Sequence, residues 1–209
     1  MRILIGDDHA VVRRGLKQIL ADEFADAVFG EAGNGAEILE RIWKEPWDLL
    51  LMDVTMPGRS GPEILKEIKC VQPTLPVLVL SVHPEDQYAV RVLKVGASGY
   101  LTKDAAPEEL ANAVRKVLAG GRYVSASLAE KLAAGLATEA KKSPHEGLSD
   151  REFDVLRMIG SGKTVKEIAA ELSLSVKTVS TYRVRVLQKL EMKNNAELTR
   201  YVIENRLSE

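Results

Sequence analysis

The chain has 209 residues, 45% of them hydrophobic and 28% charged, which is typical of a soluble globular protein of one or two domains. Its apolar stretches are far shorter than the roughly 18 residues that span a bilayer, so we expect no membrane segment. Acidic residues at Asp7 and Asp8 come too early for the apolar core of a signal peptide. Cys70 is the only cysteine, which excludes an intrachain disulfide and favours a cytoplasmic location.

The net charge of −1 hides an uneven distribution along the chain. Residues 1–120 contain 14 basic and 18 acidic side chains, a charge of −4, whereas residues 121–209 contain 15 and 12, a charge of +3. The basic part is therefore the better candidate for binding nucleic acid, although ordinary scatter also explains a difference of this size.

The first 120 residues alternate between short apolar runs and helical patterns, which predicts an α/β domain. The expected strands are 2–6, 27–32, 48–53, 76–81 and 99–102. The expected helices are 9–21, 35–44, 61–70, 86–95 and 107–118. Five strand–helix units joined by right-handed crossovers predict a doubly wound, five-stranded parallel sheet.

The remainder of the chain is expected to be helical. Residues 121–147 are interpreted as a linker that contains one alanine-rich helix, at 127–137, and a mobile end. Residues 148–209 are expected to form an all-α domain. Its four expected helices are 150–160, 165–172, 176–191 and 195–205. The second and third are separated by only three residues, which predicts a helix-turn-helix.

Charged residues follow the apolar runs at the expected carboxyl ends of three strands. Asp7 and Asp8 follow the first strand, Asp53 ends the third, and Lys103 follows the fifth. In an open parallel sheet these ends meet at the edge where ligands bind, so we expect a site for a divalent cation and a phosphoryl group. For any one aspartate, capping of the next helix is an equally good explanation.

With their neighbours, these residues resemble the receiver domain of two-component response regulators over residues 1–120. The matching residues are Asp7-Asp8, Asp53, Met56-Pro57-Gly58, Gly61, Ser81 and Gly99-Tyr100-Leu101-Thr102-Lys103-Asp104. The resemblance implies a flavodoxin-like sheet in which Asp53 accepts a phosphoryl group from a sensor histidine kinase. It also implies Mg²⁺ bound by Asp7, Asp8, Asp53 and the Thr55 backbone carbonyl, with Asp7 acting through water.

The same resemblance assigns three further roles near the phosphoryl group. Lys103 is expected to pair with the phosphoryl oxygens, and Ser81 and Tyr100 are expected to form a switch pair. In this switch the Ser81 hydroxyl bonds a phosphoryl oxygen and the Tyr100 ring rotates inward. The alternative for Tyr100 is an ordinary core tyrosine.

The expected helix 176–191 has an apolar stripe and a basic, polar opposite side. Val179, Val186 and Leu190 share the stripe, whereas the other side is suited to phosphates and base edges. Taken alone, this pattern also fits a solvated charged helix. Residues 148–207, however, resemble the LuxR-type DNA-binding domain, through Leu148-Ser149-Asp150-Arg151-Glu152, Gly162-Lys163-Thr164, Glu167-Ile168-Ala169 and Ser175-Val176-Lys177-Thr178-Val179.

This resemblance implies DNA contacts from one helix and a dimer on an inverted repeat. The expected groove contacts are Lys177, Ser180, Thr181 and Val184, the expected phosphate contacts are Thr178, Arg183 and Arg185, and Tyr182 stands where many members carry histidine. Together the two domains resemble the NarL/FixJ class of transcriptional response regulators, in which phosphorylation promotes dimerisation and operator binding.

Two other classes of function remain open on the sequence. A haloacid-dehalogenase-type phosphatase also has a strand-end aspartate nucleophile and Mg²⁺, but it needs a second aspartate two residues later, where this chain has Thr55. We therefore expect slow loss of the phosphoryl group and no enzyme. The C-terminal helices would alternatively bind protein, which their basic residues disfavour.

Overall fold

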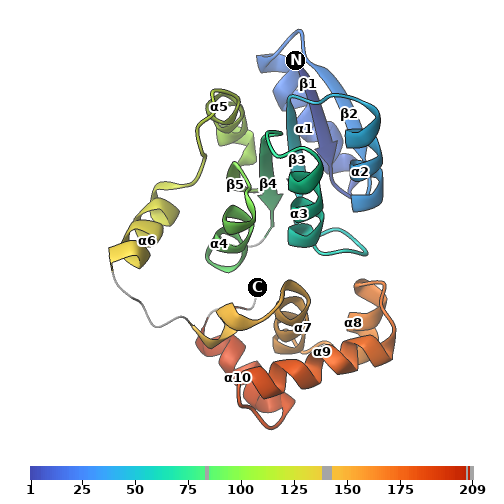
Figure 1. The fold of residues 1–209 in the computed structure, drawn as a ribbon, viewed down its shortest axis with the longest axis vertical. Coiled ribbons are helices and arrows are strands. Elements are labelled where there is room, and N and C mark those ends of the chain that lie inside the picture. Colours follow the sequence, from blue (N-terminus) through green and yellow to red (C-terminus); the bar gives the residue numbers. More distant parts are fainter. Residues whose placement is uncertain (83–84, 138–142, 206, 208–209) are drawn as a thin grey trace. The chain divides into compact units, whose positions relative to one another are not determined.

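The computed structural model describes residues 1–82, 85–137, 143–205 and 207, and the chain divides into two compact units, Met1–Thr138 and Glu139–Glu209 (Figure 1). Part of the expected linker, residues 138–142, lies outside the described residues. The rest of that linker is divided between the two units, which are described separately below.

The first unit contains the predicted five-stranded parallel sheet, in the order β2-β1-β3-β4-β5. Its strands are β1 (Arg2–Gly6), β2 (Val28–Ala32), β3 (Leu49–Asp53), β4 (Val77–Ser81) and β5 (Gly99–Thr102). Its helices are α1 (Ala10–Glu23), α2 (Gly35–Lys44), α3 (Gly61–Val71), α4 (Glu85–Val95), α5 (Ala106–Leu118) and α6 (Ala126–Ala137). The doubly wound fold class is confirmed.

Helices cover both faces of the sheet, which explains why the strands are continuous apolar runs. Helices α1 and α5 contact each other, while α3 contacts both α2 and α4, so the two groups form separate layers (Figure 1). Alternate strand residues such as Ile3, Leu51 and Leu80 share a core with Leu20 and Leu110 on the α1 and α5 side. The intervening residues of each strand face the opposite layer.

The chain continues past α5 into a short segment that adds a parallel bridge to the sheet edge. The Tyr100 N–H donates to the Tyr123 carbonyl (3.0 Å), and the Tyr123 N–H donates to the Ser98 carbonyl (3.0 Å). The Tyr123 hydroxyl donates to Glu109 at 2.5 Å. The beginning of the expected linker therefore belongs structurally to the first unit, and it covers the otherwise open edge of β5.

The second unit is helical throughout its described part. It contains the short 3₁₀ helix η1 (Pro144–Gly147) and the helices α7 (Asp150–Gly160), α8 (Val165–Glu171), α9 (Val176–Lys189) and α10 (Asn195–Glu204). Capping boxes begin α7 at Ser149 and α8 at Thr164. Helix α7 packs against α9 and α10, and α8 packs against α9. The turn between α8 and α9 places Ser173 in the left-handed region, with φ of 54°.

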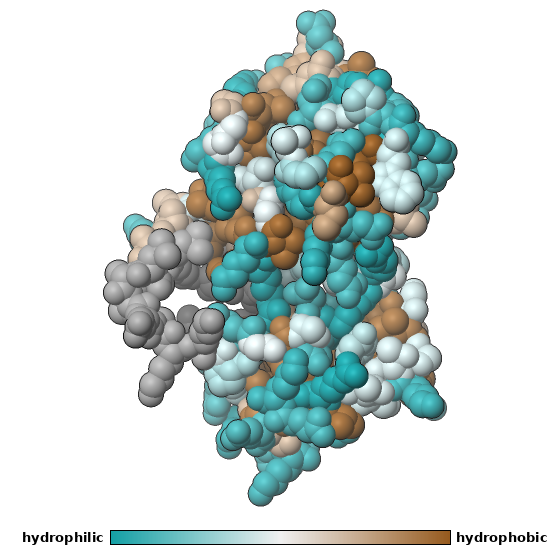
Figure 2. Space-filling model, in the orientation of Figure 1, coloured by the Kyte–Doolittle hydropathy of each residue, from teal (hydrophilic) through white to brown (hydrophobic). Residues whose placement is uncertain are grey.

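Figure 2 shows that the visible face of the molecule mixes hydrophilic residues with small, separate hydrophobic groups. Within the described parts of the chain, no helix combines the length and the apolarity that crossing a membrane requires.

Gly99 tests how closely the Tyr123 segment is packed on β5. A Cβ atom at Gly99 would lie 2.6 Å from the Tyr123 carbonyl oxygen and 2.9 Å from Leu78 Cδ1, so Gly99→Ala requires the backbone to move. We expect this substitution to lower the free energy of unfolding of the first unit by about 1–3 kcal/mol. Urea unfolding followed by tryptophan fluorescence measures this unit alone, because both tryptophans, Trp43 and Trp47, lie in it.

Gly15 provides the matched control, because it lies within α1 and a Cβ atom there would meet nothing within 4 Å. Gly15→Ala should stabilise the same unit by about 1 kcal/mol through helix propensity. Equal stability of Gly99→Ala and the wild type would show that the bridge to Tyr123 is loose.

Candidate functional site

The four charged residues predicted at the strand ends meet at one edge of the sheet. Asp7 and Asp8 directly follow β1, Asp53 is the last residue of the neighbouring strand β3, and Lys103 directly follows β5. Asp7 and Asp53 are buried, with exposed fractions of 1% and 3%. The parallel topology therefore brings together groups that lie up to 96 positions apart in the sequence, from Asp7 to Lys103.

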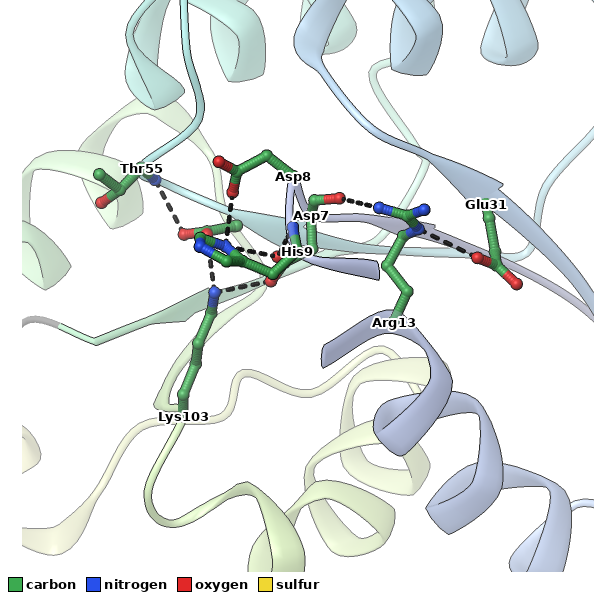
Figure 3. A network of polar contacts seen from close by, with 8 residues as sticks. Asp7, Asp8, His9, Arg13, Glu31, Thr55 and Lys103 are labelled. Atoms are coloured by element: carbon green, nitrogen blue, oxygen red, sulfur yellow. Dashed lines mark hydrogen bonds and ion pairs between the residues drawn. The ribbon is translucent and has the colours of Figure 1, made fainter. Parts of the chain in front are cut away.

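The Lys103 ammonium group connects two of the carboxylates (Figure 3). Its Nζ lies 2.6 Å from Asp7 Oδ2 and 2.7 Å from Asp53 Oδ2. The backbone of Lys103 is fixed as well, because its N–H donates to the Ser81 carbonyl at 2.8 Å. The ammonium group is thus held between the two buried carboxylates.

Backbone N–H groups hold the other oxygen of each buried carboxylate. The His9 N–H donates to Asp7 Oδ1 at 2.8 Å, and the Thr55 N–H donates to Asp53 Oδ1 at 2.8 Å. The turn after Asp53 packs closely against the start of α3, since a Cβ atom at Gly61 would lie 2.5 Å from the Val54 carbonyl oxygen. These contacts fix both carboxylates before any ligand binds.

Burial dominates the electrostatics of Asp53. It raises the pKa of this carboxyl from 3.8 to about 6, and the neighbouring Lys103 and the Thr55 N–H only partly oppose the rise. Burial acts against the charge of Lys103 too, but Asp53 and Asp7 outweigh it and raise the pKa of the ammonium group. Near neutral pH, Asp53 is therefore mainly ionised and paired with a charged Lys103.

The carboxylates form a group with the dimensions of a metal site. One ligand atom from each of Asp7, Asp8, His9 and Asp53 lies within 4.8 Å of all the others. Three of the four residues offer carboxylate oxygens, the ligands preferred by Mg²⁺ and Ca²⁺. The donor set therefore fits a hard divalent cation.

The two residues of the expected switch pair lie on the same face of neighbouring strands. Val79 of β4 pairs with Tyr100 of β5, and Ser81 pairs with Thr102, so Ser81 is the diagonal neighbour of Tyr100. Both side chains are fully buried. This burial fits the switch hypothesis and an ordinary core tyrosine equally, so the switch stays a prediction.

Three further polar residues near the site, His9, Arg13 and Glu31, were not predicted as site residues from the sequence. The ring of His9, expected only to begin a helix, lies with its Nδ1 2.9 Å from Asp8 Oδ1. Arg13 of α1 donates to the Asp7 carbonyl and pairs with Glu31 of β2 (Figure 3). The one available signal was Glu31 itself, an acid in a short strand of otherwise small and apolar residues.

Helix α9 has the predicted division into a buried and an exposed side. Val179 and Val186 are fully buried, and Leu190, just after the helix, is nearly so. The opposite side exposes Lys177, Thr181, Val184 and Arg185, while Thr178, Ser180, Tyr182 and Arg183 are half-buried. Of the four side chains expected to reach a groove, those of Lys177, Thr181 and Val184 are therefore exposed and that of Ser180 is half-buried.

Hydrogen bonds within the second unit distinguish the polar side chains of α9. The Ser180 hydroxyl donates to the Val176 carbonyl (2.8 Å) and the Thr181 hydroxyl to the Lys177 carbonyl (3.0 Å), which leaves their oxygens as acceptors. Arg183 donates to Asn195 of α10. The ammonium group of Lys189 forms an ion pair with the buried carboxylate of Glu152 at 2.7 Å.

Two protein families account for most of the chain. Residues 3–115 match the family described as "Response regulator receiver domain", and residues 146–202 match "Bacterial regulatory proteins, luxR family". The chain is 37% identical to the response regulator UvrY of Escherichia coli (strain K12) over 208 residues, covering 99% of this chain and 95% of UvrY. It is 39% identical to the response regulator GacA of Pseudomonas aeruginosa over 199 residues, covering 95% of this chain and 93% of GacA.

Solved structures of RcsB from Salmonella typhimurium are similar along nearly the whole chain. One has a TM-score of 0.73 at 28% identity and covers 98% of both chains. Another, RcsB bound to promoter rprA in the presence of phosphomimetic BeF₃⁻, has a TM-score of 0.67 at 29% identity and covers 97% of this chain and 98% of that one. The chain therefore belongs to the response regulators of the NarL/FixJ class, with a receiver domain and a LuxR-type DNA-binding domain.

Proposed function

We propose that Asp53 is the phosphoacceptor of this response regulator and that a sensor histidine kinase supplies the phosphoryl group. The observation that carries this proposal is the Lys103 ammonium group, 2.7 Å from Asp53 Oδ2 at the edge of the sheet. A fixed cation beside the nucleophile stabilises the equatorial oxygens during phosphoryl transfer.

In the transfer step, a carboxylate oxygen of Asp53 attacks the phosphorus atom of the donor. The new O–P bond forms as the P–N bond of a phosphohistidine breaks, and the histidine leaves with the electron pair. Lys103 keeps its proton and pairs with the transferred group. Asp7, Asp8, Asp53 and the Thr55 carbonyl would hold Mg²⁺, which supplies positive charge to the phosphoryl oxygens when it is bound.

The same residues support a switch more than an enzyme. A phosphatase with an aspartyl-phosphate intermediate needs a general acid close to the nucleophile, but the residue two positions after Asp53 is Thr55. Its side chain is exposed, and its backbone N–H donates to Asp53 Oδ1. We propose that the phosphorylated state therefore turns over slowly, and that Ser81 and Tyr100 respond to it.

We propose that the output is binding of a phosphorylation-dependent dimer to an inverted repeat of double-stranded DNA in the cytoplasm. Solved structures show RcsB bound to DNA and two RcsB dimers on two parallel DNAs. In this chain the exposed side of α9 offers Arg185 for phosphates, Lys177 for the groove and the phosphate beside it, and Thr181 and Val184 for base edges and the thymine methyl group.

Phosphorylation of Asp53 can be tested with acetyl phosphate and Mg²⁺. The wild type should be labelled, and Asp53→Ala should not, because the nucleophile is removed; phosphate-affinity electrophoresis and intact mass measure the product. Asp104→Ala is the control, since Asp104 is an exposed acid beside Lys103 and its loss should leave labelling unchanged. Undiminished labelling of Asp53→Ala would place the phosphoryl group elsewhere.

The raised pKa of Asp53 makes the stability of the metal-free protein depend on pH. The folded state binds this proton more tightly than the unfolded state, so the free energy of unfolding should fall as the pH rises from about 4 through about 6. The variant Asp53→Asn lacks this titration and should be more stable than the wild type at about pH 8, by about 3 kcal/mol.

Urea unfolding in EDTA, followed by tryptophan fluorescence, measures this difference at each pH. The two proteins should approach equal stability below about pH 4, where Asp53 is protonated in both the folded and the unfolded state. A difference between them that stays constant across this range would show that burial does not raise the pKa of Asp53.

The DNA-binding side of α9 can be tested with two lysines of the same helix. Lys177→Ala should weaken DNA binding because one phosphate contact is lost. The slope of the logarithm of the binding constant against the logarithm of the salt concentration should become smaller in magnitude by about 1. Lys189→Ala should reduce stability, since Glu152 loses its partner, but it should leave the salt dependence unchanged. Binding titrations at several salt concentrations would contradict the assignment if both variants behaved alike.

A further inference from the structure

Arg13 lies one helical turn beyond the residues that begin α1, and its side chain turns back toward the acidic site (Figure 3). We propose that Arg13 is a positioning residue for metal binding and phosphorylation. It fixes the peptide between Asp7 and Asp8 so that both carboxylates face Asp53, and Glu31 holds Arg13 in this orientation. The inference rests on the proposed function of the site.

The contacts of Arg13 extend in two directions from one guanidinium group. Its Nη1 donates to the Asp7 carbonyl oxygen at 2.7 Å, and its Nε donates to Glu31 Oε2 at 3.0 Å. Its side chain is 18% exposed, so the group is largely shielded from water. Charge-assisted hydrogen bonds in such surroundings are stronger than those between neutral groups.

The Asp7 carbonyl is the part of Asp7 that the sheet and α1 leave unfixed. The sheet holds the Asp7 N–H, which donates to the Ala32 carbonyl at 3.1 Å, and the start of α1 holds Asp7 Oδ1 through the His9 N–H. The carbonyl belongs to the peptide that leads to Asp8. Arg13 therefore restricts ψ of Asp7 and φ of Asp8, the torsions that set the direction of the Asp8 carboxylate.

The ion pair with Glu31 indicates that Arg13 acts through geometry more than through charge. Glu31 carries the opposite charge at 3.0 Å, so the pair together adds little net charge to the field at Asp8 and Asp53. A planar guanidinium group can donate in two fixed directions at once, which the single ammonium group of lysine does not reproduce. Groups that orient metal ligands in this way typically contribute about 10–100-fold to metal affinity.

The test compares Mg²⁺ binding by the full-length wild type, Arg13→Ala, Arg13→Lys and Arg14→Ala, using isothermal titration calorimetry. Arg14 is the matched control, because it is the next residue of α1 and its side chain is exposed. We expect about 10–100-fold weaker Mg²⁺ binding for Arg13→Ala. We expect most of this loss for Arg13→Lys and wild-type affinity for Arg14→Ala.

Phosphorylation kinetics provide a second test, because the positioning role and a purely structural role of Arg13 predict different dependences of the rate on Mg²⁺ concentration. With acetyl phosphate, Arg13→Ala should need a higher Mg²⁺ concentration for half-maximal rate, while its rate at saturating Mg²⁺ should approach that of the wild type. Urea unfolding in EDTA confirms that each variant is folded. If Arg13→Ala does not fold, Glu31→Gln replaces it, with a smaller loss of Mg²⁺ affinity expected.

The outcomes separate the inference from the proposed function. If the wild type binds Mg²⁺ and is labelled at Asp53, but the Arg13 variants match Arg14→Ala, the positioning role is wrong. Wild-type affinity in Arg13→Lys with weak binding in Arg13→Ala would show that charge is sufficient, which also overturns it. Absence of Mg²⁺ binding or of Asp53 labelling in the wild type would instead contradict the proposed function.

Discussion

The receiver domain depends on holding two buried carboxylates, Asp7 and Asp53, against the single ammonium group of Lys103. With Asp8 beside them, three carboxyl groups share the site with one ammonium group. Burial makes negative charge costly there, and the raised pKa of Asp53 expresses that cost. A divalent cation would add positive charge among these carboxyl groups, which explains why the site is suited to one.

The fold supports this unfavourable arrangement because the carboxylates are fixed from the backbone. Neighbouring parallel strands end at the same edge, and the turns that follow them point N–H groups back at Asp7 and Asp53. The layers of helices exclude water from the strands on both faces. Strand β5 belongs to the same network: Lys103 follows it, Tyr100 lies within it, and the Tyr123 backbone bonds to it. One strand thus connects the acidic site to the segment that leaves the domain.

The sequence predicts the elements, and with them the meeting of Asp7, Asp8, Asp53 and Lys103 at one sheet edge, because the elements depend on local signals. Continuous apolar runs identify strands buried on both faces, and residues such as Ser149 and Thr164 identify helix starts through short-range capping bonds. Contacts that depend on tertiary approach leave no such signal. Arg13 and Glu31 are 18 positions apart and have no spacing rule that relates them, and pairing of Tyr123 with β5 requires the finished sheet edge.

The division of α9 shows why basic residues in a sequence are an incomplete guide to DNA contacts. Lys177 and Lys189 lie on the same helix and both are exposed, yet the ammonium group of Lys189 is paired with the buried carboxylate of Glu152. A phosphate can gain little from a lysine whose charge is already paired. Since the whole chain has a net charge of −1, attraction to DNA depends on where the basic side chains of the second unit lie and not on the net charge. The orientation of each lysine, set by packing of Val179 and Val186, therefore decides which charges contribute.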